Sequence, residues 1–588
     1  MEATDYSAWS NEKLIERVTQ LEADLKRRNE SVIASIPSVN KHWKKRTERA
    51  FDPAKYNTRL VAFKLAYLGK KFNGFENHAH VTPLPTIEEE LWKAFNKARL
   101  IFPKDLKPLE PGAVNWEGTE YSKCGRTDKG VSAFGQVIGI RVRSNRPLPK
   151  KKENPKALDL ADSGADEIFN TYPRENGIET SSPPLDPSRV PFREPPVDKV
   201  TLDMGNPDFE ESLNFDPIAD EIPYCALLNR LLPPEIRILA WCPSPPLDFS
   251  ARFSCRERRY KYFFTNPCLP PVPHNLDSTT KLNPRGVKDG YLDIDAMKEA
   301  ARLFEGSHDF RNFCKVDPGK QITNFERVMF HASIQEETGI DPSIGFTASP
   351  EFAPKDGVKH SVYSFNLHGS AFLWHQVRCM VSILFLVGQG LEKPSIVSEL
   401  LDATKNPRRP TYEMATDTPL ILWDCIFPKE NDPERKDTLD WVYIGNGRGQ
   451  GDAKYGPAGL MENVWSLWRE KKMDELLVGS LIKLVQSQGD PVQELEPGKK
   501  PSRSQRCFDG SNEPKMQGSY TPVMKKPKME AVEVVNERFA IRKGFENSAD
   551  MKIKGFRNPP SIKEEKQASV QSAVEDAPQI PISRVAVD

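Results

Sequence analysis

The chain has 588 residues, with 83 basic and 83 acidic side chains and therefore no formal net charge. This length exceeds one ordinary domain, and the 51 prolines predict long irregular stretches within it. A balanced total excludes no class of partner, because only the local distribution of charge can indicate nucleic-acid binding.

Cysteine spacing and hydropathy exclude several other classes. The nine cysteines are an odd number, and none lies in a C-x-x-C pair, so the sequence favours a reducing compartment and offers no zinc-finger spacing. His78 and His80 lack further ligands at useful spacing, and we therefore expect no metal. No apolar signal-like segment opens the sequence and no window of 18 apolar residues occurs, so we expect a soluble intracellular protein without a membrane span.

Residues 1–50 are predicted to hold one short amphipathic helix and a basic segment. Leu14, Val18, Leu21 and Leu25 recur at spacings of four, three and four, which predicts a helix over residues 10–28. Such a short helix has marginal stability by itself, so it would pack either on its own domain or on a helix of a partner. Five basic residues between 41 and 49 form either a solvated face or a contact to RNA phosphates.

Regular structure is expected from about residue 58 to residue 145. Alternating apolar residues from Val61 to Tyr67 predict a strand, and a second strand is expected at 136–143. Thr86, with Glu89 three residues later, forms a capping box, which predicts that a helix begins at Thr86.

The rest of the chain alternates between compact and irregular sequence. Residues 146–222 are rich in proline and acidic residues, which predicts a disordered insertion. Compact sequence resumes over 223–428, a helical extension is expected within 429–490, and residues 491–588 are predicted to be a disordered tail.

The densest chemical signal runs from Tyr121 to Gln136. Gly125 and Gly130 flank Arg126, Thr127 and Asp128, and glycines allow close approach of a substrate to such a turn. Arg126 stands two residues before the carboxylate of Asp128, which in an extended segment puts both on one side. The plain alternative is a surface turn with a weak ion pair.

Two further segments carry charge in unusual settings. The segment from Arg230 to Tyr262 contains seven basic and only three acidic residues, with aromatic residues between them. This composition is typical of segments that bind phosphates and stack on bases. An exposed basic strand would look the same. Arg378 precedes the apolar run from Met380 to Val387, and an arginine in such a helix needs a carboxylate or phosphate partner.

Together these segments resemble the TruA family of tRNA pseudouridine synthases over roughly 58–145 and 223–428. Six motifs occur in family order, namely Tyr67-Leu-Gly with Phe72-Asn-Gly-Phe75, Thr86 to Leu91, Gly125-Arg-Thr-Asp-Lys-Gly130, Leu228 to Pro233, Ala251-Arg-Phe-Ser254 with Arg259-Tyr-Lys-Tyr262, and Phe372 to Arg378. Ser132 and Lys129 stand where bacterial members usually carry His and Ala. These residues and the ending Tyr412–Leu420 resemble a eukaryotic group that modifies tRNA positions 38 and 39.

The resemblance implies a set of site residues. Asp128 matches the family nucleophile, which assists as the N1–C1′ bond of uridine breaks and the base rejoins through C5. Arg378 matches the arginine that pairs with this aspartate and keeps it ionised, and Tyr260 matches the tyrosine that packs on the base and acts in proton transfer. Substrate-binding roles fall on Arg126, Thr127, Lys129, Arg252 and Tyr260.

The resemblance also implies an α+β fold of two similar halves, here 58–145 and 223–428, with antiparallel sheets side by side, helices on one face and an RNA-binding cleft on the other. Partners would be tRNA and a second copy of the chain in a homodimer. The isomerisation needs no metal and no nucleotide cofactor. Lys525-Lys-Pro-Lys528 resembles a nuclear import patch, so we expect the nucleus and the cytoplasm.

Three alternatives remain open from the sequence. A relative with broader specificity for tRNA and small nuclear RNA is disfavoured by Gly125 and the 412–420 ending. A non-catalytic tRNA-binding protein is disfavoured by the intact set of Asp128, Tyr260, Arg252 and Arg378. A hydrolase with two carboxylates would need a second acid, for which Glu120 is the nearest upstream residue.

Overall fold

The computed structural model describes residues 13, 15–23, 51–78, 81–103, 113–148, 215–270, 290–340, 360–429, 432–447, 453–489, 505–513, 515–517 and 519–554. The chain divides into two units, Met1–Lys55 and Tyr56–Asp588. In the first unit residues 15–23 are helical, inside the range predicted for a helix, and Pro53–Lys55 form a 3₁₀ turn. Leu14 and Leu25 of the predicted pattern lie outside the described residues.

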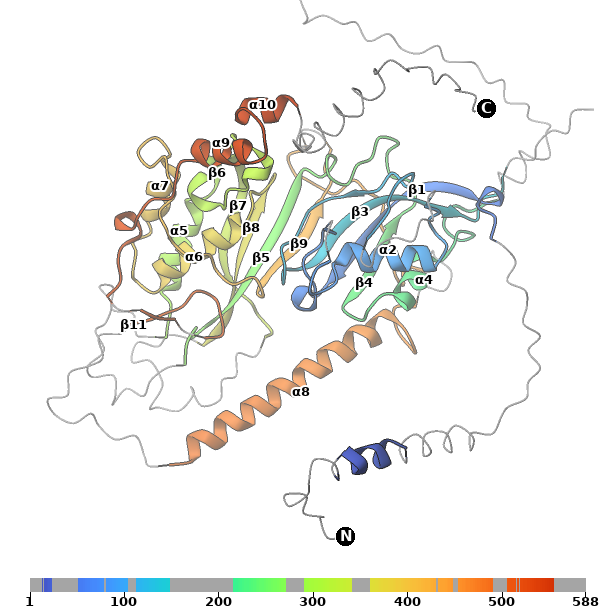
Figure 1. Cartoon of the computed structure of the whole chain (residues 1–588), viewed down its shortest axis with the longest axis horizontal. Helices are drawn as coiled ribbons and strands as arrows, with labels where there is room; N and C mark the ends of the chain where they lie inside the picture. The colour runs from blue at the N-terminus through green and yellow to red at the C-terminus, as the bar shows by residue number, and fades with distance from the viewer. Residues whose placement is uncertain are drawn as a thin grey trace, which may run out of the picture. The chain divides into compact units, whose positions relative to one another are not determined.

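A ten-stranded mixed sheet forms the centre of the second unit (Figure 1). Its order is β10-β4-β1-β3-β9-β5-β8-β7-β6, with β2 paired to β3. The strands are β1 (Asn57–Tyr67), β2 (Ser122–Lys123), β3 (Ser132–Ser144), β4 (Ile236–Cys242), β5 (Glu257–Asn266), β6 (Gly306–Asp309), β7 (Glu326–Glu336), β8 (Ser361–Gly369), β9 (Leu420–Ile426) and β10 (Val442–Tyr443). Among them only β3 and β9 pair in parallel, at Ser132↔Ile421 and Ala133↔Leu422. This large, mainly antiparallel sheet with helices agrees with the predicted mixture of α and β structure.

The helices surround two large hydrophobic cores and a third, small cluster. The α-helices of the second unit, in chain order, are α2 (Ile87–Lys97), α4 (Tyr224–Leu231), α5 (Ile294–Arg302), α6 (Gln376–Gly388), α7 (Ile396–Leu401), α8 (Leu460–Ser487), α9 (Val532–Arg542) and α10 (Ser548–Ile553). Helices α9 and α10 enclose the small cluster of Ala540, Phe545 and Met551. One large core joins β1, β3 and β4 to α2 and α4. The other joins β5, β7 and β8 to α5 and α6. Strand β9 lies between the two groups of strands and contributes side chains to both cores.

The first predicted strand and helix form as expected. Every second residue of β1 from Val61 to Tyr67 is buried in one core, as the alternation predicts. The Thr86 hydroxyl accepts a hydrogen bond from the Glu89 backbone N–H at 3.2 Å and caps α2. The strand predicted at 136–143 begins earlier, at Ser132.

The prediction of a disordered tail over 491–588 is wrong for residues 505–554. This stretch forms a small hairpin of β11 (Gln505–Cys507) and β12 (Lys515–Gln517), followed by α9 and α10. Phe508 and Val523 are buried in the core around α6. The segment has few apolar residues, and it folds because these few dock on a core that other elements have already built.

The predicted insertion and the helical extension also differ in detail. Residues 149–214 lie outside the described residues, but Glu221 is buried and accepts hydrogen bonds from Ser144 and Asn145. Ordered structure therefore resumes before residue 223. Within 429–490, β10 adds a strand to the main sheet before α8 begins. In the part of the chain that the structure describes, no helix is long and apolar enough to cross a membrane.

Candidate active site

The loop between β2 and β3 carries Asp128 and rests on the segment that follows β1. The Thr127 hydroxyl lies 2.8 Å from the Tyr67 hydroxyl, and the Thr127 carbonyl accepts the Phe75 N–H at 3.1 Å. Gly74 lies directly beneath with φ of +89°, and a Cβ there would stand 2.8 Å from the Thr127 carbonyl oxygen. Only glycine therefore fits under this loop without displacing it.

Hydrogen bonds fix both ends of the same loop. The Gln136 side chain, fully buried, donates to the Gly125 carbonyl at 3.0 Å and accepts from the Gly125 N–H at 3.3 Å. At the other end the Gly69 N–H donates to the Ser132 hydroxyl at 3.0 Å. A loop held at its ends and from beneath keeps its carboxylate in one place, which precise chemistry requires.

Asp128 lies in a partly buried pocket of mixed charge. Its Oδ2 is 3.4 Å from Nε2 of His375. Burial raises the pKa of Asp128, while the charge of Arg378, a hydrogen bond with the Trp374 side chain and the charge of Lys320 act in the opposite direction. Burial also lowers the pKa of His375 to about 4, helped by nearby Arg378. The imidazole facing Asp128 is therefore neutral near pH 7.

Arg378 stabilises the ionised Asp128 from a distance. Its Nε donates to the Ala415 carbonyl at 2.7 Å, and its Nη2 lies 4.0 Å from Oδ2 of Asp417. The pairing expected between Arg378 and Asp128 is thus a longer-range attraction, and burial outweighs it in setting the pKa of Asp128. The charge of Arg378 lowers the pKa of Asp128, but burial raises it by more, so the carboxylate is harder to ionise than an ordinary aspartate.

Tyr260 lies on β5 at the boundary of the two cores. Its ring meets that of Phe372 edge-on, with centroids 4.9 Å apart. Burial, followed by nearby negative groups that include Asp128, raises the pKa of Tyr260 far above its ordinary value. The phenol is therefore protonated at any working pH and can donate a hydrogen bond.

These residues line one cleft with a volume of about 1480 Å³. Nine Lys or Arg side chains and five Asp or Glu side chains line it, so its lining has a positive excess that suits a polyanion. The basic residues are Lys123, Arg126, Lys129, Arg252, Arg258, Lys315, Lys320, Arg327 and Arg378. Phe253 and Trp374 add partly exposed rings on which an unpaired base could stack.

Comparison with known proteins decides the family. A family model described as tRNA pseudouridine synthase matches residues 300–428. The tRNA pseudouridine(38/39) synthase of Saccharomyces cerevisiae is 36% identical over 433 residues, which cover 72% of this chain and 72% of the relative. The enzyme of the same name from Homo sapiens is 35% identical, over 74% of this chain and 68% of the relative. The chain belongs to the tRNA pseudouridine synthase family. A bacterial member, tRNA pseudouridine synthase A of Delftia acidovorans, is 29% identical over 41% of this chain and 82% of its own length.

The structure can be compared with the seven site residues that the family resemblance predicts. All seven line the cleft around Asp128. Arg126 pairs with Glu76 at 3.1 Å yet remains half exposed, and Lys129 and Arg252 are exposed. Thr127 differs, because its side chain is buried and bonded to Tyr67. Its hydroxyl therefore supports the loop, which fits a positioning role better than direct binding.

Other residues of the cleft were missed by the sequence analysis. Trp374 and His375 lie within a recognised motif, but nothing in their spacing indicated contact with Asp128. Lys315 and Lys320 place their ammonium groups 5.0 and 5.9 Å from the Trp374 ring centroid. These two lysines belong to no motif, and only the fold brings them to the cleft.

Two expectations about acids and metals can now be revised. Glu120, considered as the second acid of a hydrolase, pairs with Arg141 at 2.7 Å and is absent from the described lining of the cleft. The spacing of cysteine and histidine residues in the sequence predicted no metal site. The fold nevertheless gathers Cys124, Cys255 and Cys425 into one buried cluster.

Proposed function

We propose that this chain converts uridine to pseudouridine in the anticodon stem-loop of tRNA, at positions 38 and 39. The names of the relatives from Saccharomyces cerevisiae and Homo sapiens support the reaction and the positions. The observation that carries the proposal is the convergence of Asp128, Tyr260 and Arg378 in one basic cleft of the size that a flipped nucleotide and its neighbours require.

The Asp128 carboxylate acts as the nucleophile in this proposal. The N1–C1′ bond breaks, the base rotates, and a C5–C1′ bond forms before the C5 proton leaves. The carboxylate can attack the sugar carbon, act through a glycal, or add to the base. Its partial burial suits all three routes, because a poorly solvated carboxylate is more reactive than one held by water. The protonated phenol of Tyr260 packs on the base and takes part in proton transfer.

Basic residues of the cleft hold the RNA. Arg126, Lys129 and Arg252 are exposed and can contact phosphates on either side of the extruded uridine. Trp374, with two ammonium groups beside it, offers a positively flanked ring for stacking. These contacts favour an unpaired or readily opened loop nucleotide, as in the anticodon arm.

We also propose the finer architecture and assembly that the family resemblance implies. The presence of two large hydrophobic cores supports two similar halves. Homodimer formation is supported by α8, which exposes large apolar residues such as Trp465, Trp468 and Leu477. Sedimentation of the purified chain tests this, and a monomer at micromolar concentration would contradict it.

Localisation to the nucleus and the cytoplasm remains a proposal that rests on Lys525-Lys-Pro-Lys528. This run is folded, since Lys525 ends a 3₁₀ turn and Nζ of Lys528 is buried. An import receptor that binds this run in extended form would require the segment to open first. Imaging a Lys525→Ala, Lys526→Ala double variant tests the role of the run, and unchanged distribution would remove it.

Pseudouridine mapping tests the function directly. Total tRNA from cells that carry either the wild-type chain or Asp128→Asn is compared, with Asp295→Asn on the exposed surface of α5 as the matched control. The expected result is loss of pseudouridine from positions 38 and 39 with Asp128→Asn only. Loss elsewhere would favour the enzyme of broader specificity, and no loss would favour a non-catalytic tRNA-binding protein.

The same variant separates chemistry from folding. A pKa that is raised in the folded chain means that stability is lost as the pH rises through that pKa, because the ionised carboxylate is poorly solvated in the fold. Asparagine carries no charge, so Asp128→Asn should unfold at a temperature equal to or above that of the wild type at neutral pH. An inactive variant with lowered stability would leave the nucleophile assignment without support.

A further inference from the structure

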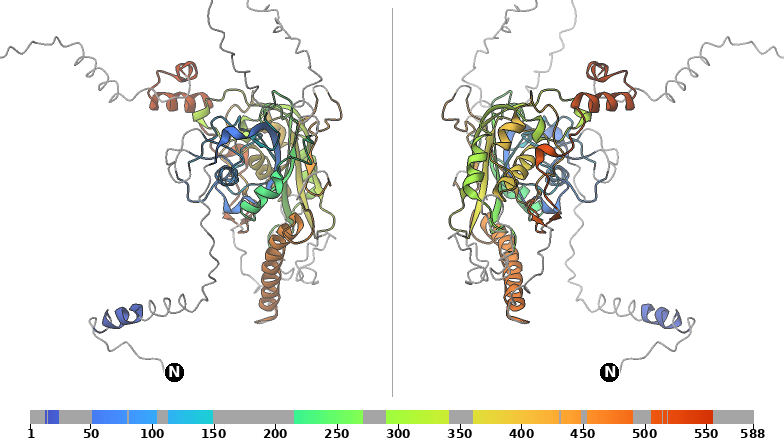
Figure 2. Two further views of the ribbon diagram at one scale, coloured as in Figure 1. Left: turned by 90° about the vertical axis from the view of Figure 1, so that its right-hand side faces the viewer. Right: turned by 90° about the vertical axis from the view of Figure 1, so that its left-hand side faces the viewer.

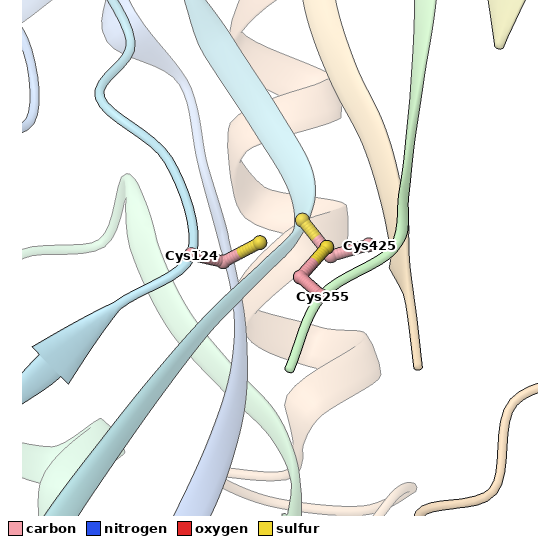
Figure 3. Close-up of side chains that lie close together, drawn as sticks. All are labelled: Cys124, Cys255 and Cys425. Carbon is pink, nitrogen blue, oxygen red and sulfur yellow. The ribbon is translucent and has the colours of Figure 1, made fainter. Parts of the chain in front are cut away.

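Three buried thiols meet beside the catalytic loop. Cys124 follows β2, Cys255 precedes β5, and Cys425 lies on β9. Their sulfur atoms all lie within 4.8 Å of one another, and the three side chains turn toward a common point (Figure 3). They come from segments more than 100 residues apart, which is why the sequence spacing gave no indication of a site.

The spacing of the sulfur atoms suits a tetrahedral ion. Zn²⁺ binds thiolate sulfur at about 2.3 Å, which places two sulfur ligands about 3.8 Å apart. Contraction from the upper limit of 4.8 Å requires only small side-chain adjustments. Cys124 and Cys255 also border the cleft, so a water molecule can reach a fourth position.

The charge of Arg258 gives a second, independent indication. Its guanidinium donates to the carbonyl oxygens of Ser370 at 2.8 Å, Cys124 at 2.9 Å, Arg252 at 3.2 Å and Cys255 at 3.5 Å. Among the described residues these contacts include no carboxylate. A partly buried cation bound only to carbonyl groups lacks a counter-charge, which is costly. Three thiolates around one Zn²⁺ carry a net charge of −1 and would supply it.

We propose that Cys124, Cys255 and Cys425 bind one Zn²⁺ ion, with water from the cleft as the fourth ligand. The ion ties the start of the catalytic loop to β9 and to the segment before β5. Cys124 directly precedes Gly125, so the ion positions the Asp128 loop and takes no part in the isomerisation. Neutral thiols packed as small apolar groups would leave Arg258, in the chain without RNA, with carbonyl partners alone among the described residues.

Metal content tests the site in the full-length chain. The chain is produced with added zinc, freed of any affinity tag, and measured by elemental mass spectrometry. We expect about one zinc per chain, a loss of ten-fold or more in Cys425→Ser, and full retention in Cys268→Ser, which alters a cysteine outside the cluster. Zinc that survives Cys425→Ser, or a folded wild-type chain without zinc, would overturn the proposal.

A second measurement keeps the test valid if Cys425→Ser does not fold. Wild-type chain stripped of metal by a chelator under reducing conditions is titrated with Co²⁺, whose thiolate complexes absorb in the near ultraviolet and whose tetrahedral geometry gives intense visible bands. Saturation at one equivalent, reversed by Zn²⁺, supports the site whatever the catalytic activity. Absence of these bands in folded protein, or a disulfide between two of the three cysteines, would refute it.

Discussion

Replacing Gly74 by alanine measures how firmly the Asp128 loop is supported from beneath. The added Cβ would stand 2.8 Å from the Thr127 carbonyl oxygen, and the loop would have to retreat until that distance reached about 3.4 Å, where ordinary contact begins. The positive φ adds roughly 1–2 kcal/mol of backbone strain, and the overpacking adds roughly 1–3 kcal/mol. We therefore expect a total destabilisation of about 2–5 kcal/mol.

Activity should fall further than stability alone explains. A misplacement of about 1 Å at a reacting group costs about 10²-fold in rate, so a smaller retreat predicts roughly a ten-fold loss of kcat with little change in KM. Single-turnover conversion of an anticodon stem-loop measures the rate, and thermal unfolding measures the stability.

Gly339 supplies the matched control. Its φ of +84° resembles that of Gly74, but nothing lies within 4 Å of an added Cβ. Gly339→Ala should therefore show the backbone strain alone, about 1–2 kcal/mol, with kcat unchanged. If Gly74→Ala and Gly339→Ala behave alike in both assays, the loop does not depend on the close contact beneath it.

Three further predictions concern single side chains. Arg378→Met removes the largest attraction that lowers the pKa of Asp128, so the acid limb of the kcat–pH profile should move to higher pH, and an unmoved limb would show that the arginine acts otherwise. Tyr260→Phe keeps the ring but removes the hydroxyl, so kcat should fall about 10²–10⁴-fold with tRNA affinity retained; an unchanged kcat would exclude proton transfer by the phenol. Phe508→Ala should destabilise the chain by about 3–5 kcal/mol because its ring is buried on α6, whereas exposed Met529→Ala should have little effect, and equal melting temperatures would mean that the 505–554 segment is not docked.

Sequence patterns correctly predicted the strand and the helix start that depend on neighbouring residues alone. The alternation from Val61 to Tyr67 and the cap at Thr86 depend on neighbours in the sequence, and both appear in the structure as expected. The seven residues taken from the family motifs all line the cleft, because a motif carries information that composition lacks, and their roles stay predictions. The docking of Phe508 could not be predicted, since its apolar partners on α6 lie more than 100 residues away.

The misjudged features share one physical cause, which is long-range contact. Arg378 was expected to pair with Asp128, but the fold also brings Asp417 within reach, and the cation lies nearer to that second carboxylate. Burial then sets the pKa of Asp128, and burial is a property of the whole assembly around a residue. The clustered cysteines follow the same rule, because no spacing pattern connects Cys124 with Cys425.

The position of β9 has a consequence for the order in which this chain can fold. Strands β3 and β5 flank β9 in the sheet (Figure 1, with two side views in Figure 2), yet β9 is the last of the three to be synthesised. Until the ribosome has released residue 426, both flanking strands present open edges, which are prone to pair with other chains. A nascent chain stalled before β9 should therefore aggregate readily and depend on chaperones, whereas release of the seven residues of β9 covers the edge of β5 and the start of β3 together.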